Sequence, residues 1–215
     1  MHLLCTKSAR PAAALLFVVG FVSLGGDAAL AHHPMGGVTP ANFTHGLLSG
    51  LGHPIIGLDH FAALVAAGCL AATQPRGALV AVIYVLAMLA GAVAHVQALS
   101  LPAGEVLVAL SLLALGAFLV LARPNFVAAA LVFGFAGIVH GHALGEAITG
   151  AEPTPLYAYF AGLALIHGAL IVGIVLVVQQ LVSRQWLEAA RVQLVGAAVV
   201  GIGLAGIAQQ LLPAA

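Results

Sequence analysis

The residues best suited to chemistry in this sequence lie in the stretch 52–60, where polar groups interrupt a segment of mostly apolar residues. It contains His53, Asp59 and His60. On one continuous helix, His53 and His60 would lie about 20° apart on the same face, with Asp59 about 100° round from His60. Imidazole and carboxylate groups together suit a divalent transition metal. Ionisable groups among apolar residues at membrane depth indicate a functional site.

A purely structural interpretation of this stretch stays open. His53 would cap a helix, Pro54 would occupy its first turn, and Asp59 would lie near the positive end of the helix. This interpretation accounts for Pro54 and Asp59. It gives no role to His60.

A second polar group lies in residues 139–146. His142 and Glu146 are four residues apart and share a helix face. His140 lies about 160° round from His142, so one straight helix cannot direct both at one ion. Small residues recur every four positions here, which permits close helix packing: Gly137, Gly141 and Gly145. Packing alone is the favoured interpretation of these glycines.

Composition indicates a membrane protein. Of the 215 residues, 63% are hydrophobic and only 6% are charged, whereas soluble domains carry about 25% charged residues. The mean hydropathy is +1.18. The net charge of zero gives no basic surface for nucleic acid. The two cysteines, Cys5 and Cys69, are not expected to form a disulfide, because Cys5 lies in a segment that we expect to be removed.

That segment, residues 1–31, has the pattern of a secretory signal peptide. Lys7 and Arg10 precede a short apolar run, and Ala29-Leu30-Ala31 fits a cleavage site. An uncleaved first membrane helix is the alternative. Cleavage would leave His32 and His33 at a free amino terminus, where they would capture a metal transiently or form only a polar tail.

The mature chain then predicts an all-α membrane protein with six transmembrane helices. Residues 32–53 form an extracytoplasmic segment, in which 43–51 is too short to span and would be re-entrant, interfacial or an extension of the first span. The six spans make up the transmembrane domain, residues 54–215. They are 54–73, 77–99, 104–122, 126–149, 155–181 and 189–212.

Charge placement predicts the orientation. With the mature amino terminus outside the cytoplasm, four arginines fall in inner loops, as the positive-inside bias requires: Arg76, Arg123, Arg184 and Arg191. Both termini are then extracytoplasmic, in the inner (plasma) membrane. His53 would lie at the outer surface and His60 roughly 8–10 Å deeper. His95, His140, His142 and Glu146 fall in the outer half as well, with His167 near mid-membrane.

The two polar stretches resemble the motifs of a known family. H-P-x-x-G-x-D-H at 53–60 is similar to the first motif of the HupE/UreJ membrane proteins, and residues 139–146 partly match a second motif, F-H-G-x-A-H-G-x-E. Val139, Leu144 and Ala147 depart from it. Residues 151–156 also look family-like. The family is associated with nickel or cobalt uptake, so the resemblance implies a polytopic metal transporter.

We therefore expect uptake of a divalent transition metal, nickel or cobalt ahead of zinc or copper, through ligands in the outer half of the bundle. The expected partners are the metal ion and the lipid bilayer, with self-association open. The sequence contains no phosphate-binding loop, so nothing in it suggests that the protein uses a nucleotide. A membrane-embedded zinc hydrolase, with Glu146 as its base, is one alternative. A metal-binding accessory protein without flux is the other. The candidate ligands are His32, His33, His53, Asp59, His60, His95, His140, His142, Glu146 and His167.

Overall fold

The computed structural model describes residues 38–74, 76–121, 125–184 and 189–212. These residues form helices and connecting turns without a strand, which confirms the all-α class. The elements, in chain order, are α2 (Phe43–Ile56), α3 (Leu58–Thr73), α4 (Gly77–Val96), α5 (Gly104–Leu121), α6 (Phe126–Gly145), the 3-10 turn η1 (Glu146–Ile148), α7 (Pro153–Ser183) and α8 (Ala189–Leu211).

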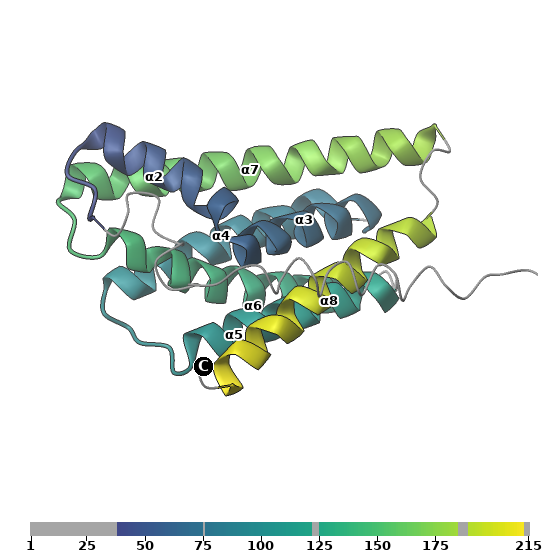
Figure 1. Ribbon diagram of the computed structural model, residues 1–215. Helices are drawn as coiled ribbons and strands as arrows, with labels where there is room; N and C mark the ends of the chain where they lie inside the picture. Colours follow the sequence, from purple (N-terminus) through teal and green to yellow (C-terminus); the bar gives the residue numbers. More distant parts are fainter. Residues whose placement is uncertain (1–37, 75, 122–124, 185–188, 213–215) are drawn as a thin grey trace, which may run out of the picture.

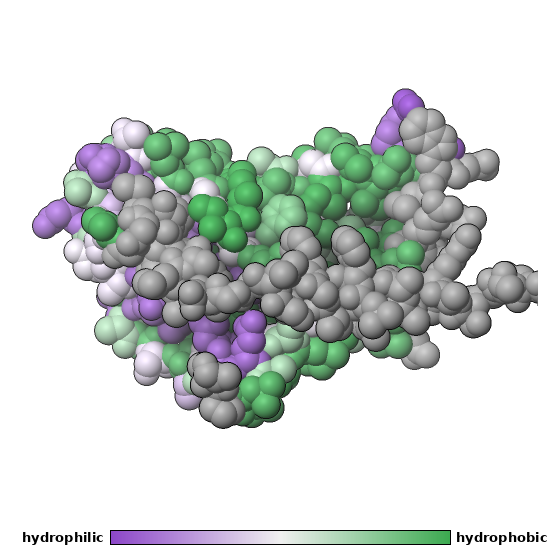
Figure 2. Space-filling view, viewed as in Figure 1, coloured by the Kyte–Doolittle hydropathy of each residue, from purple (hydrophilic) through white to green (hydrophobic). Residues whose placement is uncertain are grey.

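The length and apolar character of the helices are those of a multi-pass membrane protein. Five of the described helical segments are long and apolar enough to cross a bilayer, and α2 with α3 would supply a sixth crossing as one broken span. The five unbroken helices begin and end within a few residues of the predicted spans. The helices carry exposed leucines and valines, and Figure 2 shows apolar side chains over much of the surface that is not grey.

The first span differs from the prediction, because it is not one helix. The pair α2 and α3 is bent by 78°. Gly57 has an extended backbone and its amide closes the last turn of α2 on the His53 carbonyl. Asp59 then favours a new helix start, since its carboxylate accepts from the His60 amide at 2.8 Å and lies at a positive helix end.

The helix bounds bear on two expectations. Pro54 lies inside α2 and not in the first turn of a helix. The expected boundary between residues 53 and 54 falls within α2. His53 is 3% exposed and so is buried within the protein, while its depth in the membrane stays a prediction.

Helix α2 lies along the first half of α7 (Figure 1). Glycines allow this contact, because a Cβ on Gly46 would collide with the Pro155 carbonyl and one on Gly50 with the Tyr159 carbonyl. Gly162 of α7 meets the Leu47 carbonyl in the same way. Close backbone contact through small residues stabilises helix pairs in membranes, and here it fixes where α2 ends.

The glycine row of α6 packs against α4, which agrees with the packing interpretation. A Cβ on Gly141 would overlap the Met88 carbonyl, and one on Gly137 would come within 2.6 Å of the Tyr84 carbonyl. In the same way, a Cβ on Gly91 of α4 would overlap the Ile138 carbonyl of α6. This close approach sets the spacing of the side chains that α4 and α6 carry.

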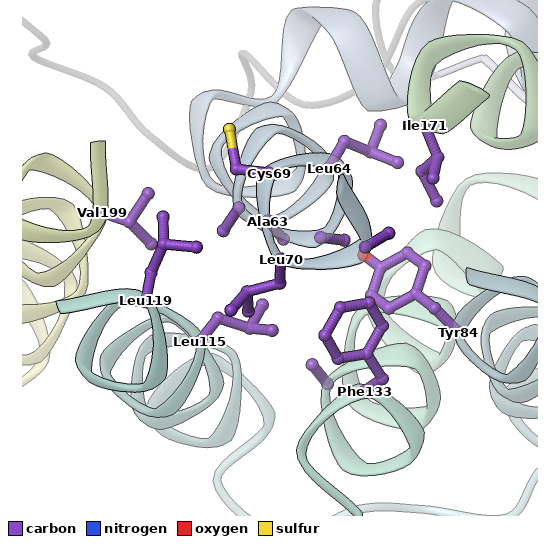
Figure 3. Close-up of a cluster of buried hydrophobic side chains, with 14 of the residues drawn as sticks. Ala63, Leu64, Cys69, Leu70, Tyr84, Leu115, Leu119, Phe133, Ile171 and Val199 are labelled. Atoms are coloured by element: carbon purple, nitrogen blue, oxygen red, sulfur yellow. The ribbon is translucent and has the colours of Figure 1, made fainter. Parts of the chain in front are cut away.

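Helix α3 forms the centre of the bundle. Ten of its 16 residues are buried, and Figure 3 shows apolar side chains of the neighbouring helices gathered around it. Tyr84 and Phe133 meet edge to face, with ring centroids 6.1 Å apart. A helix this enclosed can carry polar groups that lipid never contacts.

The predicted signal peptide, residues 1–31, and the capture residues His32 and His33 lie outside the described residues. Cleavage and capture therefore stay predictions. So does the orientation, which rests on the arginines.

Candidate functional site

The break between α2 and α3 brings two histidines together inside the bundle. His53 is in the last turn of α2 and His60 in the first turn of α3, and they are 3% and 4% exposed. Their ring centroids are 5.6 Å apart at an interplanar angle of 81°. Asp59 adds a half-buried carboxylate beside His60. The predicted first motif is therefore one cluster, although two helices build it instead of one helix face.

His60 is joined to α6 and α5 through a buried hydrogen-bond chain. Its Nδ1 lies 2.8 Å from Nδ1 of His140. Nε2 of His140 lies 2.9 Å from the Ser111 hydroxyl, which donates to the Val108 carbonyl at 2.7 Å. His140 and Ser111 are both fully buried. This chain ties three helices together at the histidine pair.

His53 is joined to α7 and α6 by a second chain. Its Nδ1 lies 2.9 Å from the hydroxyl of Tyr159, which donates to the Leu144 carbonyl at 2.6 Å. Leu144 lies in the last turn of α6, where carbonyls have no partner within the helix. Tyr159 is fully buried, so the contact is shielded from water and lipid.

A separate pair of histidines lies at the ends of α4 and α6. Nδ1 of His95 is 3.3 Å from Nδ1 of His142, and Nε2 of His142 donates to the Leu99 carbonyl at 2.7 Å. The sequence expectation that His140 and His142 face different neighbours is confirmed. Glu146, by contrast, is exposed and makes no hydrogen bond to His142 among the described residues. The role of Glu146 as a metal ligand beside His142 stays a prediction.

His167 lies within α7 and is 1% exposed. Its Nδ1 donates to the Leu163 carbonyl one turn earlier, at 2.8 Å. Its ring lies 6.2 Å from the ring of Tyr84. The hydroxyl of Tyr84 is buried and has no hydrogen-bond partner among the described residues. His167 therefore packs as a buried core histidine whose Nδ1 is satisfied within its own helix.

The described residues bring potential metal ligands together in pairs of histidines. No group of three or more His, Cys, Asp or Glu side chains is placed to hold a metal within the described ranges. The pair His53–His60 and the pair His95–His142 lie on different helix ends. Pairs of neutral imidazoles bind a divalent ion less tightly than a closed four-ligand cage, which suits an ion that must leave again.

Two residues of this arrangement were missed from the sequence. Ser111 is the only hydroxyl residue in α5, where its neighbours are apolar. This isolation is the feature of the sequence that could have identified it. Tyr159 gave no such signal, because Tyr157 stands two residues away and is 70% exposed. Only the packing of α2 on α7 distinguishes the two tyrosines.

Comparison with known proteins identifies the family of this chain. The chain matches the family model described as HupE / UreJ protein over residues 10–206. It is similar to Protein HupE of Rhizobium leguminosarum bv. viciae, with 34% identity over 133 residues, covering 60% of this chain and 70% of that protein. No solved structure matches the chain. The chain therefore belongs to the HupE/UreJ family, a transporter-type family of membrane proteins associated with nickel and cobalt uptake.

Proposed function

We propose that this protein carries a divalent transition metal ion, nickel or cobalt first, inward across the inner membrane. The proposal has His53, Asp59 and His60 as the ligands at the break between α2 and α3. One observation carries it: two buried imidazoles lie edge to face where a membrane helix is interrupted, and the neighbouring residue Asp59 supplies a half-buried carboxylate. Discontinuous helices are the usual place for ion sites in transporters.

The spacing of the two imidazoles suits one shared ion. A first-row divalent ion binds imidazole nitrogen at about 2.1 Å, which puts it roughly 3.2 Å from each ring centroid. Two such rings can stand up to about 6.4 Å apart. The centroids of His53 and His60 are 5.6 Å apart, within that limit. Asp59 would add an oxygen ligand and a negative charge.

The remaining candidate ligands are proposed to act along the same route. His95 and His142 would receive the ion at the outer end of α4 and α6, with Glu146 exposed nearby. His167 lies deeper, halfway along α7. His32 and His33 would capture metal before it reaches the bundle. An inside-negative potential would then favour inward movement of a cation.

The test is metal flux by the purified protein. Liposomes that contain the protein and a trapped metal-sensitive dye are given nickel chloride outside, and dye quenching is followed. Wild-type protein should take up Ni²⁺. Asp59→Asn and His60→Ala should each reduce the rate more than about tenfold, because both remove a proposed ligand. Asn at 59 keeps a side-chain oxygen that can accept from the His60 amide, as Asp59 does.

His45→Ala is the matched control, since His45 also lies in α2 but makes no side-chain hydrogen bond to the cluster among the described residues. It should transport at the wild-type rate. Wild-type flux in both Asp59→Asn and His60→Ala would contradict the proposed ligands. Tight Ni²⁺ binding without any flux would instead identify an accessory metal-binding protein.

A further inference from the structure

The chain from His60 to Ser111 has one consistent arrangement of protons. A carbonyl only accepts hydrogen bonds, so the 2.7 Å contact from Ser111 to the Val108 carbonyl uses the single hydroxyl proton. The oxygen of Ser111 must then accept from Nε2 of His140, 2.9 Å away. Nε2 of His140 is therefore the nitrogen that carries hydrogen.

The same reasoning passes from His140 to His60. A neutral imidazole has one N–H and one lone-pair nitrogen. With hydrogen on Nε2, Nδ1 of His140 accepts, and the contact at 2.8 Å requires Nδ1 of His60 to donate. The lone pair of His60 is then on Nε2. The hydrogen bond at one ring nitrogen thus decides which nitrogen can bind a metal.

We infer that His140 and Ser111 are positioning residues, which hold His60 in the orientation and tautomer that bind the ion and do not touch the ion themselves. In this arrangement of protons, both ring nitrogens of His140 form hydrogen bonds, one as a donor and one as an acceptor. Both residues are fully buried, so water does not replace either partner. The consequence for metal binding rests on the proposed function, but the proton arrangement does not.

The proton arrangement can be measured without metal. Protein labelled with ¹⁵N-histidine is studied by NMR at about pH 8, where ordinary histidines are neutral. The signals are assigned by substitution of single histidines. We expect hydrogen on Nε2 of His140 and on Nδ1 of His60. Ser111→Ala should remove this preference at His140, because the acceptor is gone. Hydrogen on Nδ1 of His140 in the wild-type protein would overturn the inference.

Nickel binding separates a positioning role from a ligand role. Affinity for nickel chloride is measured by calorimetry on purified protein. Ser111→Ala should weaken it about 10–100-fold, as loss of a hydrogen bond behind a ligand does, and Ser111→Thr should restore most of it. Ser49→Ala is the control, since Ser49 is also buried but makes no hydrogen bond to a histidine among the described residues. It should bind as the wild type does.

His140→Asn gives the sharpest comparison. An asparagine oxygen can occupy the place of Nδ1 and accept from His60, yet the amide is a poor nickel ligand. We expect His140→Asn to keep an affinity within about tenfold of the wild type, while His140→Ala loses much more. Equal loss in both variants would show that His140 binds the ion directly. If the wild-type protein bound no nickel, the proposed function would fail, and the NMR measurement would still decide the inference.

Discussion

At the scale of single residues, the most consequential contacts are hydrogen bonds that hold a histidine from behind. Tyr159 shows this for His53. Its hydroxyl bridges Nδ1 of His53 and the Leu144 carbonyl, and all three groups are buried against other helices. A residue outside any metal motif thereby determines how a proposed ligand is presented.

Tyr159→Phe should lower the free energy of unfolding by about 1–3 kcal/mol, because it removes two buried hydrogen bonds, to His53 and to the Leu144 carbonyl. It should also weaken nickel binding. Thermal unfolding in detergent and calorimetry measure the two effects. Tyr157→Phe, at the exposed tyrosine of the same helix, should change neither. Equal stability of both variants would show that the bridge contributes nothing.

The sequence predicted most of the residue types at this site, but few of their partners. His53, Asp59 and His60 stand out because charge and imidazole are costly in an apolar segment. Nothing in their spacing tells that His60 meets His140 or that His142 meets His95, since these contacts depend on how α4 and α6 approach each other. The row of glycines in α6 predicted a close contact with another helix, but not which residues of that helix would face the glycines. Helix geometry places His142 and Glu146 on one face, but it does not reveal that His95 is the hydrogen-bond partner of His142.

At the scale of elements, close backbone contact between α4 and α6 sets the position of His140. Gly141→Ala should separate these helices, since the added Cβ would overlap the Met88 carbonyl, a backbone group that cannot move aside. We expect a loss of about 1–3 kcal/mol in stability and weaker nickel uptake. Gly134→Ala, in the same helix with only Ile83 near, at 3.9 Å, is the control and should match the wild type in both measurements.

The break at Gly57 is the element that the sequence did not predict. The sequence predicts one continuous span over residues 54–73, and Pro54 is a residue typical of the first turn of a helix. In the structure, Gly46 and Gly50 hold the preceding residues against α7 as a helix that continues past Pro54. That contact is made with residues more than 100 positions later in the chain. The other helices were predictable because apolar length alone identifies them.

At the scale of the whole molecule, described turns and helix ends gather at two ends of the bundle. The turns before α5 and α7 lie at one end, together with the start of α2, and the end of α7 lies at the other (Figure 1). The visible face carries much of its polar surface near the first of these ends (Figure 2). The arginines of the sequence predict that the second end faces the cytoplasm.

Cysteine labelling in intact cells checks this orientation. In a protein without Cys5 and Cys69, Leu99→Cys should react with a membrane-impermeant maleimide from outside. Ser183→Cys should react only after the membrane is opened. Both positions are exposed at opposite ends of the bundle. The reverse pattern would invert the topology and with it the proposed direction of transport.

The broken span also has a consequence for how the protein is made. His60 finds His140 only 80 residues later in the chain, and His53 finds Tyr159 only 106 residues later. At roughly 5–20 residues per second, the ribosome needs several seconds to supply these partners. During that time the first span presents imidazoles and open helix ends to hydrocarbon, which is unfavourable. The break between α2 and α3 thus gains its hydrogen-bond partners only once α6 and the first half of α7 have been made.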